Sequence, residues 1–258
     1  MNFFSSDPCS VFSAEEMVKT FTDRKNLRFQ DLLLEQLAFV TFTRPDLQEL
    51  MDRGGKGRRI ESWGNRGTPI FYGEGWVAVQ SAFSAPLAVM LLEEMVALGV
   101  KRVIIIGYCG SLQEEVTVGD IVLPDEALRE EGTSYHYLEK KKRSLPDKWV
   151  QDRLMTWMSE AAFRPQRGPI WTTDAPYRET REKVMRYQGK GILGVEMEMA
   201  AAFAFGLAKK VSIGALLLVS DELRMNGWKQ GFFSDPLNRT RKNVLTVLLS
   251  HVRELIPH

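Results

Sequence analysis

Short apolar segments recur along the chain from residue 37 onward and alternate with longer amphipathic segments. Their enrichment in β-branched and aromatic residues is typical of strands. In the first half of the chain the predicted strands are Leu37–Phe42, Pro69–Tyr72, Trp76–Gln80, Val100–Ile106 and Val118–Leu123. In the second half they are Pro169–Thr173, Ile192–Glu196 and Val211–Ser220. The last of these is almost wholly apolar, as expected of a strand covered by helices on both faces.

The segments between the strands carry helix signals. The clearest one, Ser84–Gly99, has a serine before the helix, a proline in its first turn and a glycine after its end. Further helices are predicted at Trp149–Phe163, Arg178–Tyr187 and Met197–Lys210, and a last one that opens at Asp235. Residues 1–35 contain scattered apolar positions without a strand pattern, and they predict a helical N-terminal extension.

Alternating strands and helices predict one α/β domain over residues 36–258, built on a mixed, largely parallel sheet with helices on both faces. The length of 258 residues and the hydrophobic content of 44% are sufficient for a large core. No linker rich in proline, glycine or serine divides the chain, and no internal repeat is visible. A single domain is therefore expected after the extension.

Charge and composition narrow the classes of binding partner that we expect for this protein. The formal net charge is only +1, from 34 basic and 33 acidic residues, so we expect neither nucleic acid nor a membrane surface as partner. The N-terminus lacks a signal-peptide pattern, and no apolar run approaches the roughly 20 residues that span a bilayer. These features predict a soluble, cytoplasmic protein. The two cysteines have no metal-ligand spacing, and we predict no metal.

Candidate chemistry lies where the strands end, because ligands of α/β folds gather beyond the carboxyl ends of strands. Three segments stand out there, namely Gly107–Ser111, Glu196–Glu198 and Ser220–Asp221. We predict that Gly107 and Gly110 form a tight turn with exposed N–H groups that suit an anion or a base edge, with an ordinary loop as the alternative. Cys109 has no histidine partner in the sequence and is expected to line the site through packing.

Three acidic residues are the main catalytic candidates. In an extended segment Glu196 and Glu198 face one side and Met197 the other. Buried carboxylates need hydrogen-bond donors, and the hydroxyl groups of a sugar supply them. A solvated helix start is the alternative for this pair, but its apolar neighbours favour burial. Asp221 follows a long apolar strand, where desolvation favours the protonated acid, and a helix cap is its alternative.

Four segments in a fixed order carry a family resemblance: Gly99–Leu112, Val118–Leu123, Gly194–Ala201 and Val219–Asp221. The chain resembles the nucleoside phosphorylase family, which includes uridine phosphorylases, trimeric or hexameric purine nucleoside phosphorylases and methylthioadenosine nucleosidases. The V-E-M-E and S-D signals together are the specific part of this match.

The resemblance implies a role for each matching residue. Glu198, with Glu196 and Met197, is expected to hold the ribose. Asp221 is expected to act as the general acid at N7 of a purine leaving group, assisted by an arginine of the last helix, for which Arg239 is the candidate. The predicted base contacts are Cys109, Gly110, Tyr177 and Val195.

The phosphate site departs from the family pattern. The usual arginine two residues before Gly107 is replaced by Ile105, and the usual serine or threonine after it by Tyr108. The family's N-terminal Gly-Asp-Pro-x-x-Arg loop is absent, and its nearest counterpart is the stretch 43–46. We predict that phosphate is bound by Arg44, Gly107 and Tyr108, with Arg58 or Arg59 as further candidate cations if 53–59 is not simply a mobile surface loop.

The resemblance implies phosphorolysis of a purine nucleoside to free base and ribose 1-phosphate, with inorganic phosphate as co-substrate and without a cofactor. Hydrolysis by water, phosphorolysis of uridine, and nucleoside binding without turnover are the alternatives. Uracil is disfavoured because Thr180 and Glu182 stand where resembling uridine phosphorylases carry a glutamine and an arginine. We also expect a homo-oligomer, because members of this family often complete their pocket with a residue of a neighbouring subunit.

Overall fold

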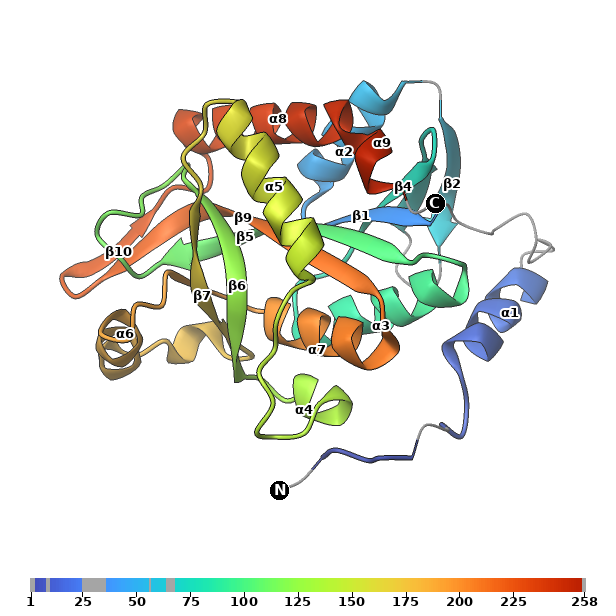
Figure 1. Ribbon diagram of the computed structural model, residues 1–258, viewed down its shortest axis with the longest axis horizontal. Helices are drawn as coiled ribbons and strands as arrows, with labels where there is room; N and C mark the ends of the chain where they lie inside the picture. The colour runs from blue at the N-terminus through green and yellow to red at the C-terminus, as the bar shows by residue number, and fades with distance from the viewer. Residues whose placement is uncertain (1–2, 8–9, 25–35, 56, 64–67, 257–258) are drawn as a thin grey trace.

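The computed structural model describes residues 3–7, 10–24, 36–55, 57–63 and 68–256. These residues form a ten-stranded mixed sheet with helices on both faces (Figure 1). The strands are β1 Leu37–Thr41, β2 Arg58–Trp63, β3 Thr68–Tyr72, β4 Trp76–Gln80, β5 Arg102–Ser111, β6 Ile121–Glu130, β7 Gln166–Thr173, β8 Gly194–Glu196, β9 Ser212–Arg224 and β10 Gly227–Gln230. The helices are α1 Ala14–Arg24, α2 Arg44–Gly54, α3 Ala85–Ala97, α4 Ser134–Tyr137, α5 Lys148–Glu160, α6 Arg181–Gln188, α7 Met199–Lys209, α8 Asp235–Ser250 and α9 Val252–Leu255. The predicted single α/β domain is confirmed.

One part of the sheet closes on itself. The strand order is β10-β9-β6-β7-β8-β5-β1-β4-β3-β2, and β9 pairs with β5 as well as with β6 and β10. This additional pairing joins β5, β9, β6, β7 and β8 into a ring, from which β1, β4, β3 and β2 extend as an open sheet. The strands β4, β1, β5 and β9 run parallel to one another, so their carboxyl ends lie at one edge.

Two hydrophobic cores lie on opposite faces of the sheet, because side chains alternate along each strand. In β5, Val103 and Ile105 pack in the core that contains α3 and α7. The residues between and after them, Ile104 and Ile106, pack in the other core, which contains side chains of α2, α5 and α8. In Figure 1, α5 and α8 lie on one side of the central strands and α3 and α7 on the other.

Small residues allow two helices to approach the sheet closely. The first eight residues of α7 are all buried, among them Ala200, Ala201 and Ala202. On the opposite face, a Cβ added at Gly214 of β9 would lie 2.3 Å from Val150 Cγ1 of α5. A side chain at position 214 would therefore displace α5 from the sheet.

The helix α1 provides the described helical part of the N-terminal extension. It is amphipathic, and Val18 is fully buried in the core that contains α3. Residues 25–35, which the sequence also assigned to the extension, lie outside the described residues. The division of the chain at residue 35 stays a prediction.

The two strands that carry the candidate site are longer than predicted. β5 does not end at Ile106 but continues to Ser111, so the tight turn expected at Gly107 and Gly110 is wrong. Neither glycine has a positive φ. Both are needed for close packing instead, because a Cβ would lie 2.9 Å from Leu217 Cδ2 at Gly107 and 2.4 Å from Leu223 Cδ1 at Gly110. β9 likewise continues past Ser220.

The segment 53–59 is not a single loop. α2 ends at Gly54 and β2 begins at Arg58, so the described part of this stretch contains a helix end and the start of a strand. Arg59 is exposed on β2 and does not line the pocket described below. The glycine-rich composition gave no indication of β2 because pairing with β3 determines this strand.

Candidate active site

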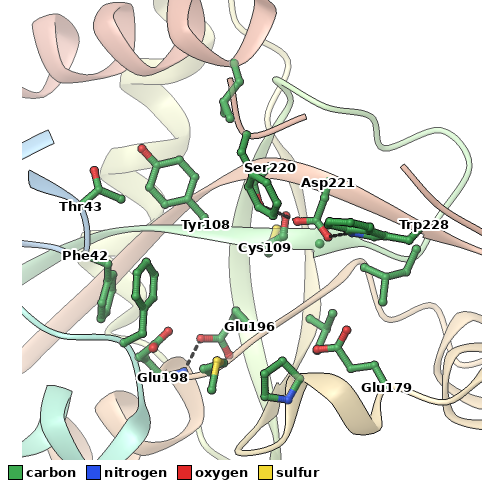
Figure 2. Close-up of a pocket in the computed structure, with 18 of the residues that line it drawn as sticks. Phe42, Thr43, Tyr108, Cys109, Glu179, Glu196, Glu198, Ser220, Asp221 and Trp228 are labelled. Atoms are coloured by element: carbon green, nitrogen blue, oxygen red, sulfur yellow. Dashed lines mark hydrogen bonds between the residues drawn. The ribbon is translucent and has the colours of Figure 1, made fainter. Parts of the chain in front are cut away.

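A cavity of about 900 Å³ opens at the carboxyl ends of β1, β5 and β9. Its size lies within the range of roughly 300–1,000 Å³ that is common for small-molecule sites. The described residues that line it are Phe42, Thr43, Pro45, Phe83, Tyr108, Cys109, Gly110, Pro176, Tyr177, Glu179, Val195, Glu196, Met197, Glu198, Ser220, Asp221, Leu223, Trp228, Phe232, Phe233, Leu237, Asn238 and Arg241. Figure 2 shows the side chains at its centre.

A β-bulge positions Asp221. Cys109 of β5 is paired with Val219 of β9, but the next residue, Gly110, is paired with Asp221, so that Ser220 is the extra residue of β9. Such bulges redirect the side chains that follow them and are frequent beside active sites. The absence of a side chain at Gly110 leaves room for the carboxyl group, since a Cβ there would lie 2.9 Å from Asp221 Oδ2.

Two hydrogen bonds hold the Asp221 carboxyl group in place. The Ser220 hydroxyl donates to Oδ1 at 2.7 Å, and the indole Nε1 of Trp228 donates to Oδ2 at 2.8 Å. Trp228 belongs to β10, which folds back on β9 as a hairpin. The end of β9 and its hairpin thus hold the acid at the wall of the cavity (Figure 2).

Glu196 is tied to the start of α7. One of its oxygens accepts from the backbone N–H groups of Glu198 and Met199, at 2.6 and 2.8 Å, and the other accepts from the Thr172 hydroxyl. These donors include free N–H groups of the first turn of α7, so Glu196 acts as a cap for that helix. Both carboxylate oxygens of Glu196 are thereby engaged within the protein.

Glu198 has different partners from Glu196 although both are buried. Its Oε1 accepts from the backbone N–H of Ser84 at 2.6 Å. Ser84 has a φ of 120°, in a region that favours glycine, so the backbone before α3 is strained where it meets this carboxylate. Burial raises the pKa of both glutamates. Of the two, Glu198 is therefore better placed for a ligand's hydroxyl groups.

Glu179 is an acidic lining residue that the sequence analysis did not select. Burial and the nearby charge of Asp221 raise the pKa of Glu179 to about 7, against the opposing effect of Lys183. It follows a short 3-10 helix, Pro176–Arg178, in the stretch already considered for base recognition. Its neighbours Thr180 and Glu182 do not line the cavity, because Thr180 caps α6 and Glu182 pairs with Arg186.

Aromatic side chains form much of the remaining wall. Phe42 and Phe83 stack with ring centroids 5.8 Å apart, and Trp228 and Phe232 lie 5.9 Å apart. Tyr177 is fully exposed at the rim. Flat apolar walls of this kind suit the faces of a heterocyclic base.

A fully buried carboxylate, that of Asp46 in the first turn of α2, lies next to the lining residues Thr43, Tyr108 and Arg241. The Tyr108 hydroxyl is 2.9 Å from both carboxylate oxygens, and the Thr43 hydroxyl donates to Oδ2 at 2.5 Å. Arg241 Nη1 lies 3.3 Å from Oδ1. We call these four residues the Asp46 cluster.

The structure brings most of the predicted site residues into one cavity. Those that line it are Tyr108, Cys109, Gly110, Tyr177, Val195, Glu196, Met197, Glu198 and Asp221. Burial raises the pKa of the Cys109 thiol, which agrees with a lining rather than a nucleophilic residue.

Three predicted residues do not line the cavity. Arg239 is exposed on α8, and Arg241, two residues further along the helix, lines the cavity instead. Arg44 is exposed at the start of α2, and Gly107 is buried within β5. The sequence did not indicate the helical phase of α8 relative to the pocket, which depends on how the helix packs.

Within the described part of the chain, no helix is long and apolar enough to cross a membrane. The same part contains no group of three or more histidine, cysteine or acidic side chains arranged to hold a metal ion. The fold and the pocket define an α/β protein with an acidic, aromatic-walled cavity at the carboxyl ends of parallel strands, where such folds bind small ligands.

The chain belongs to the phosphorylase superfamily, because the model of that family matches residues 38–253. It is 31% identical over 163 residues to a guanosine phosphorylase of Halorubrum lacusprofundi, a match that covers 63% of this chain and 68% of that protein. The structure is similar to a purine nucleoside phosphorylase from Toxoplasma gondii, with a TM-score of 0.78, 20% identity and coverage of 89% of this chain and 94% of the other. It is also similar to an AMP nucleosidase from Bacteroides thetaiotaomicron, with a TM-score of 0.74, 24% identity and coverage of 94% and 98%.

Proposed function

We propose that this protein cleaves the N-glycosidic bond of a purine nucleoside, with Asp221 at the base and Glu198 at the ribose. The observation that carries the proposal is that these two carboxyl groups, from β9 and from the start of α7, line the same cavity with a gap between them (Figure 2). Membership of the phosphorylase superfamily supports this class of reaction.

The proposed mechanism follows from the charges that develop as the bond breaks. The ribose becomes oxocarbenium-like and the leaving base gains negative charge, so groups that stabilise both charges lower the barrier. Glu198 accepts hydrogen bonds from the ribose hydroxyl groups, and Met197 packs against the sugar. Glu196 holds Glu198 and the first turn of α7 in place through its hydrogen bonds to the backbone. Asp221 donates a proton to N7 of the base.

Several features support a purine. The cavity wall near Asp221 contains Trp228, and the rim contains Tyr177, so a bicyclic base has aromatic contacts available. Cys109 and Gly110 of β5 and Val195 of β8 line the same cavity. Thr180 and Glu182 do not line the cavity, so the sequence argument against uracil from these two positions gives no support. A carboxylic acid at Asp221 is useful opposite N7, an atom that uracil lacks.

The acceptor of the ribose is either phosphate or water. Phosphorolysis is the reaction expected from the resemblance, and it would yield ribose 1-phosphate. Of the residues predicted to bind phosphate, however, only Tyr108 lines the cavity, and its hydroxyl is engaged by Asp46. Binding without turnover is the least supported alternative, because an acid aimed at the leaving group has no evident use in binding alone.

A panel of nucleosides tests the proposal. The protein is incubated with inosine, guanosine, adenosine and uridine, with and without inorganic phosphate, and release of the free base is followed by chromatography. We expect release from at least one purine nucleoside and none from uridine. Release from uridine alone would show that the base class is wrong. If no nucleoside loses its base in either buffer, the enzymatic proposal fails.

A further inference from the structure

The Asp46 cluster contains hydrogen-bond donors that could otherwise bind an anion. Thr43 caps α2, whose N-terminus carries a partial positive charge, and Arg241 supplies a full one. All of these groups face a carboxylate of the chain itself. Thr43 accepts from the Asp46 N–H at 3.3 Å and donates to its carboxylate, and Arg241 forms an ion pair with it.

Burial keeps Arg241 and Asp46 paired with each other. The side chain of Asp46 is 0% exposed and that of Arg241 is 11% exposed, so neither group can turn to solvent without breaking the pair. Removing one partner from a buried pair leaves an uncompensated charge, which is strongly unfavourable. Burial and the nearby Asp46 raise the pKa of the Tyr108 hydroxyl. The hydroxyl therefore keeps its proton and donates a hydrogen bond to this carboxylate.

The other ionisable side chains that line the cavity are acidic. Among the described lining residues the acids are Glu179, Glu196, Glu198 and Asp221, and Arg241 is the one basic side chain. Because Arg241 is already paired with Asp46, a phosphate dianion would enter a cavity without a free cation from these residues. An anion buried without a cation partner is strongly unfavourable. A neutral acceptor meets no such penalty.

We propose that the acceptor is water and that the reaction is hydrolysis, because the donors of Thr43, Tyr108 and Arg241 are already paired with the carboxylate of Asp46. This inference rests on the proposed glycosidic cleavage. The water oxygen forms a bond to C1′ while the bond from C1′ to N9 breaks and its electron pair passes to the base. N7 of the base receives a proton from Asp221, the attacking water releases one proton to solvent, and solvent reprotonates Asp221. The products are free base and ribose.

Product analysis is the first test. A purine nucleoside that the protein cleaves is incubated in ¹⁸O-labelled water with and without millimolar inorganic phosphate. We expect free ribose labelled at C1 in both cases and a rate that changes less than twofold with phosphate. Formation of ribose 1-phosphate, or a rate that depends on phosphate, would overturn the inference and leave the proposed cleavage intact. Failure to cleave any nucleoside would overturn the proposed function and this inference with it.

Calorimetric titration with inorganic phosphate tests the cluster independently of turnover. We expect no binding to the unmodified protein at millimolar phosphate. Asp46→Asn keeps the size of the side chain but removes its charge, which frees Arg241, so phosphate affinity should rise at least tenfold. The double variant Asp46→Asn/Arg241→Gln should lose this gain. The matched control is Asp52→Asn, which removes one negative charge from the exposed side of the same helix.

Two results would contradict the role of the cluster. One is phosphate binding to the unmodified protein at the affinity of Asp46→Asn. The other is an Asp46→Asn variant that is folded by circular dichroism yet binds phosphate no better than the unmodified protein. If Asp46→Asn does not fold, the product analysis of the unmodified protein still decides between water and phosphate.

Discussion

At the scale of single residues, Glu196 and Glu198 have different hydrogen-bond partners. Replacement by glutamine is therefore expected to have different effects at the two positions. Glu198→Gln removes charged hydrogen bonds to the ribose, each worth about 1.5–3 kcal/mol. We therefore expect kcat/KM to fall by about 10- to 100-fold. Steady-state kinetics on the best purine nucleoside of the panel measures this. An unchanged kcat/KM in a folded variant would remove Glu198 from the site.

Glu196→Gln is the matched substitution, and we expect it to lower stability. The carboxylate of Glu196 caps α7 and accepts a hydrogen bond from the Thr172 hydroxyl. An amide group replaces one acceptor by a donor, so we expect a loss of about 1–2 kcal/mol in the free energy of unfolding. Thermal or urea unfolding monitored by circular dichroism measures it. A stability equal to that of the unmodified protein would show that the cap contributes little.

Asp221→Asn separates binding from bond cleavage. Asparagine keeps one acceptor oxygen for Trp228, while the Ser220 hydroxyl can still donate to the Cys109 carbonyl, but an amide cannot transfer a proton. A proton donor matters mainly as the bond breaks, so we expect kcat to fall far more than substrate binding weakens. Single-turnover rates and equilibrium binding of the nucleoside are the two measurements. Equal losses in both would indicate a binding residue instead of a general acid.

Glu179 should make stability depend on pH. Its pKa in the folded protein is raised to about 7 from an ordinary value of 4.5, so the folded state holds this proton more tightly than the unfolded state does. The stability that comes from the protonated form is fully present below pH 4.5 and is lost as pH rises through 7.

The variant Glu179→Gln removes this titration, so its Tm should increase relative to the unmodified protein as pH rises from 4.5 to 7. Thermal unfolding of both proteins across that range measures the difference. Glu182→Gln, at an exposed position of α6, is the control and should show no such trend. A difference in Tm that is constant with pH would contradict the shifted pKa of Glu179.

At the scale of elements, the approach of α5 to β9 depends on Gly214. A Cβ there would lie 2.3 Å from Val150 Cγ1 and 3.1 Å from Val150 Cβ. Gly214→Ala should therefore cost about 1–3 kcal/mol in the free energy of unfolding, as overpacked cores do. Chemical denaturation measures this.

The double variant Val150→Ala/Gly214→Ala tests the cause of that loss. Removing the two methyl groups of Val150 makes room for the new Cβ, so the double variant should lose less stability than the sum of the two single variants. Additive losses would show that α5 adjusts its position and that Val150 is not the obstacle.

The positions of the elements were largely predictable from the sequence, but the ends of the key strands were not. β4, α3 and the start of α8 at Asp235 lie where the pattern placed them. The strand β5 extends five residues beyond its predicted end, to Ser111, and β9 extends four residues beyond its own, to Arg224. Their glycines and polar residues resemble a loop in the sequence, but pairing between the two strands satisfies their backbone groups.

At the scale of the whole molecule, the cavity rim presents an aromatic surface. Phe83, Tyr177, Trp228 and Phe233 are all exposed there. Exposed apolar patches commonly mark interaction surfaces. We therefore predict a homo-oligomer in solution, and light scattering measures its mass.

Phe233→Ser tests whether the rim contributes to this assembly. The exposed fraction of Phe233 is 89%, and we expect the substitution to shift the protein toward smaller species. Met185→Ser, at an exposed position of α6 that does not line the cavity, is the control and should leave the mass unchanged. A fully active monomer would contradict the predicted oligomer.

The sequence by itself determined the fold class and pointed to nine of the residues that line the cavity. Period-two and helical patterns are local, so they are readable without a structure. Glu198 and Asp221 were found because acids directly after apolar strands are costly to bury and therefore conspicuous.

Only the tertiary structure decided which arginine faces the cavity and what surrounds it. Arg241 lines the cavity and Arg239 does not, because the packing of α8 sets which side chains face inward. Asp46 meets Tyr108 across 62 residues of sequence, through the parallel pairing of β1 with β5. No local pattern encodes such a contact, because its energy depends on the burial and charge of groups that come together only when the sheet is assembled.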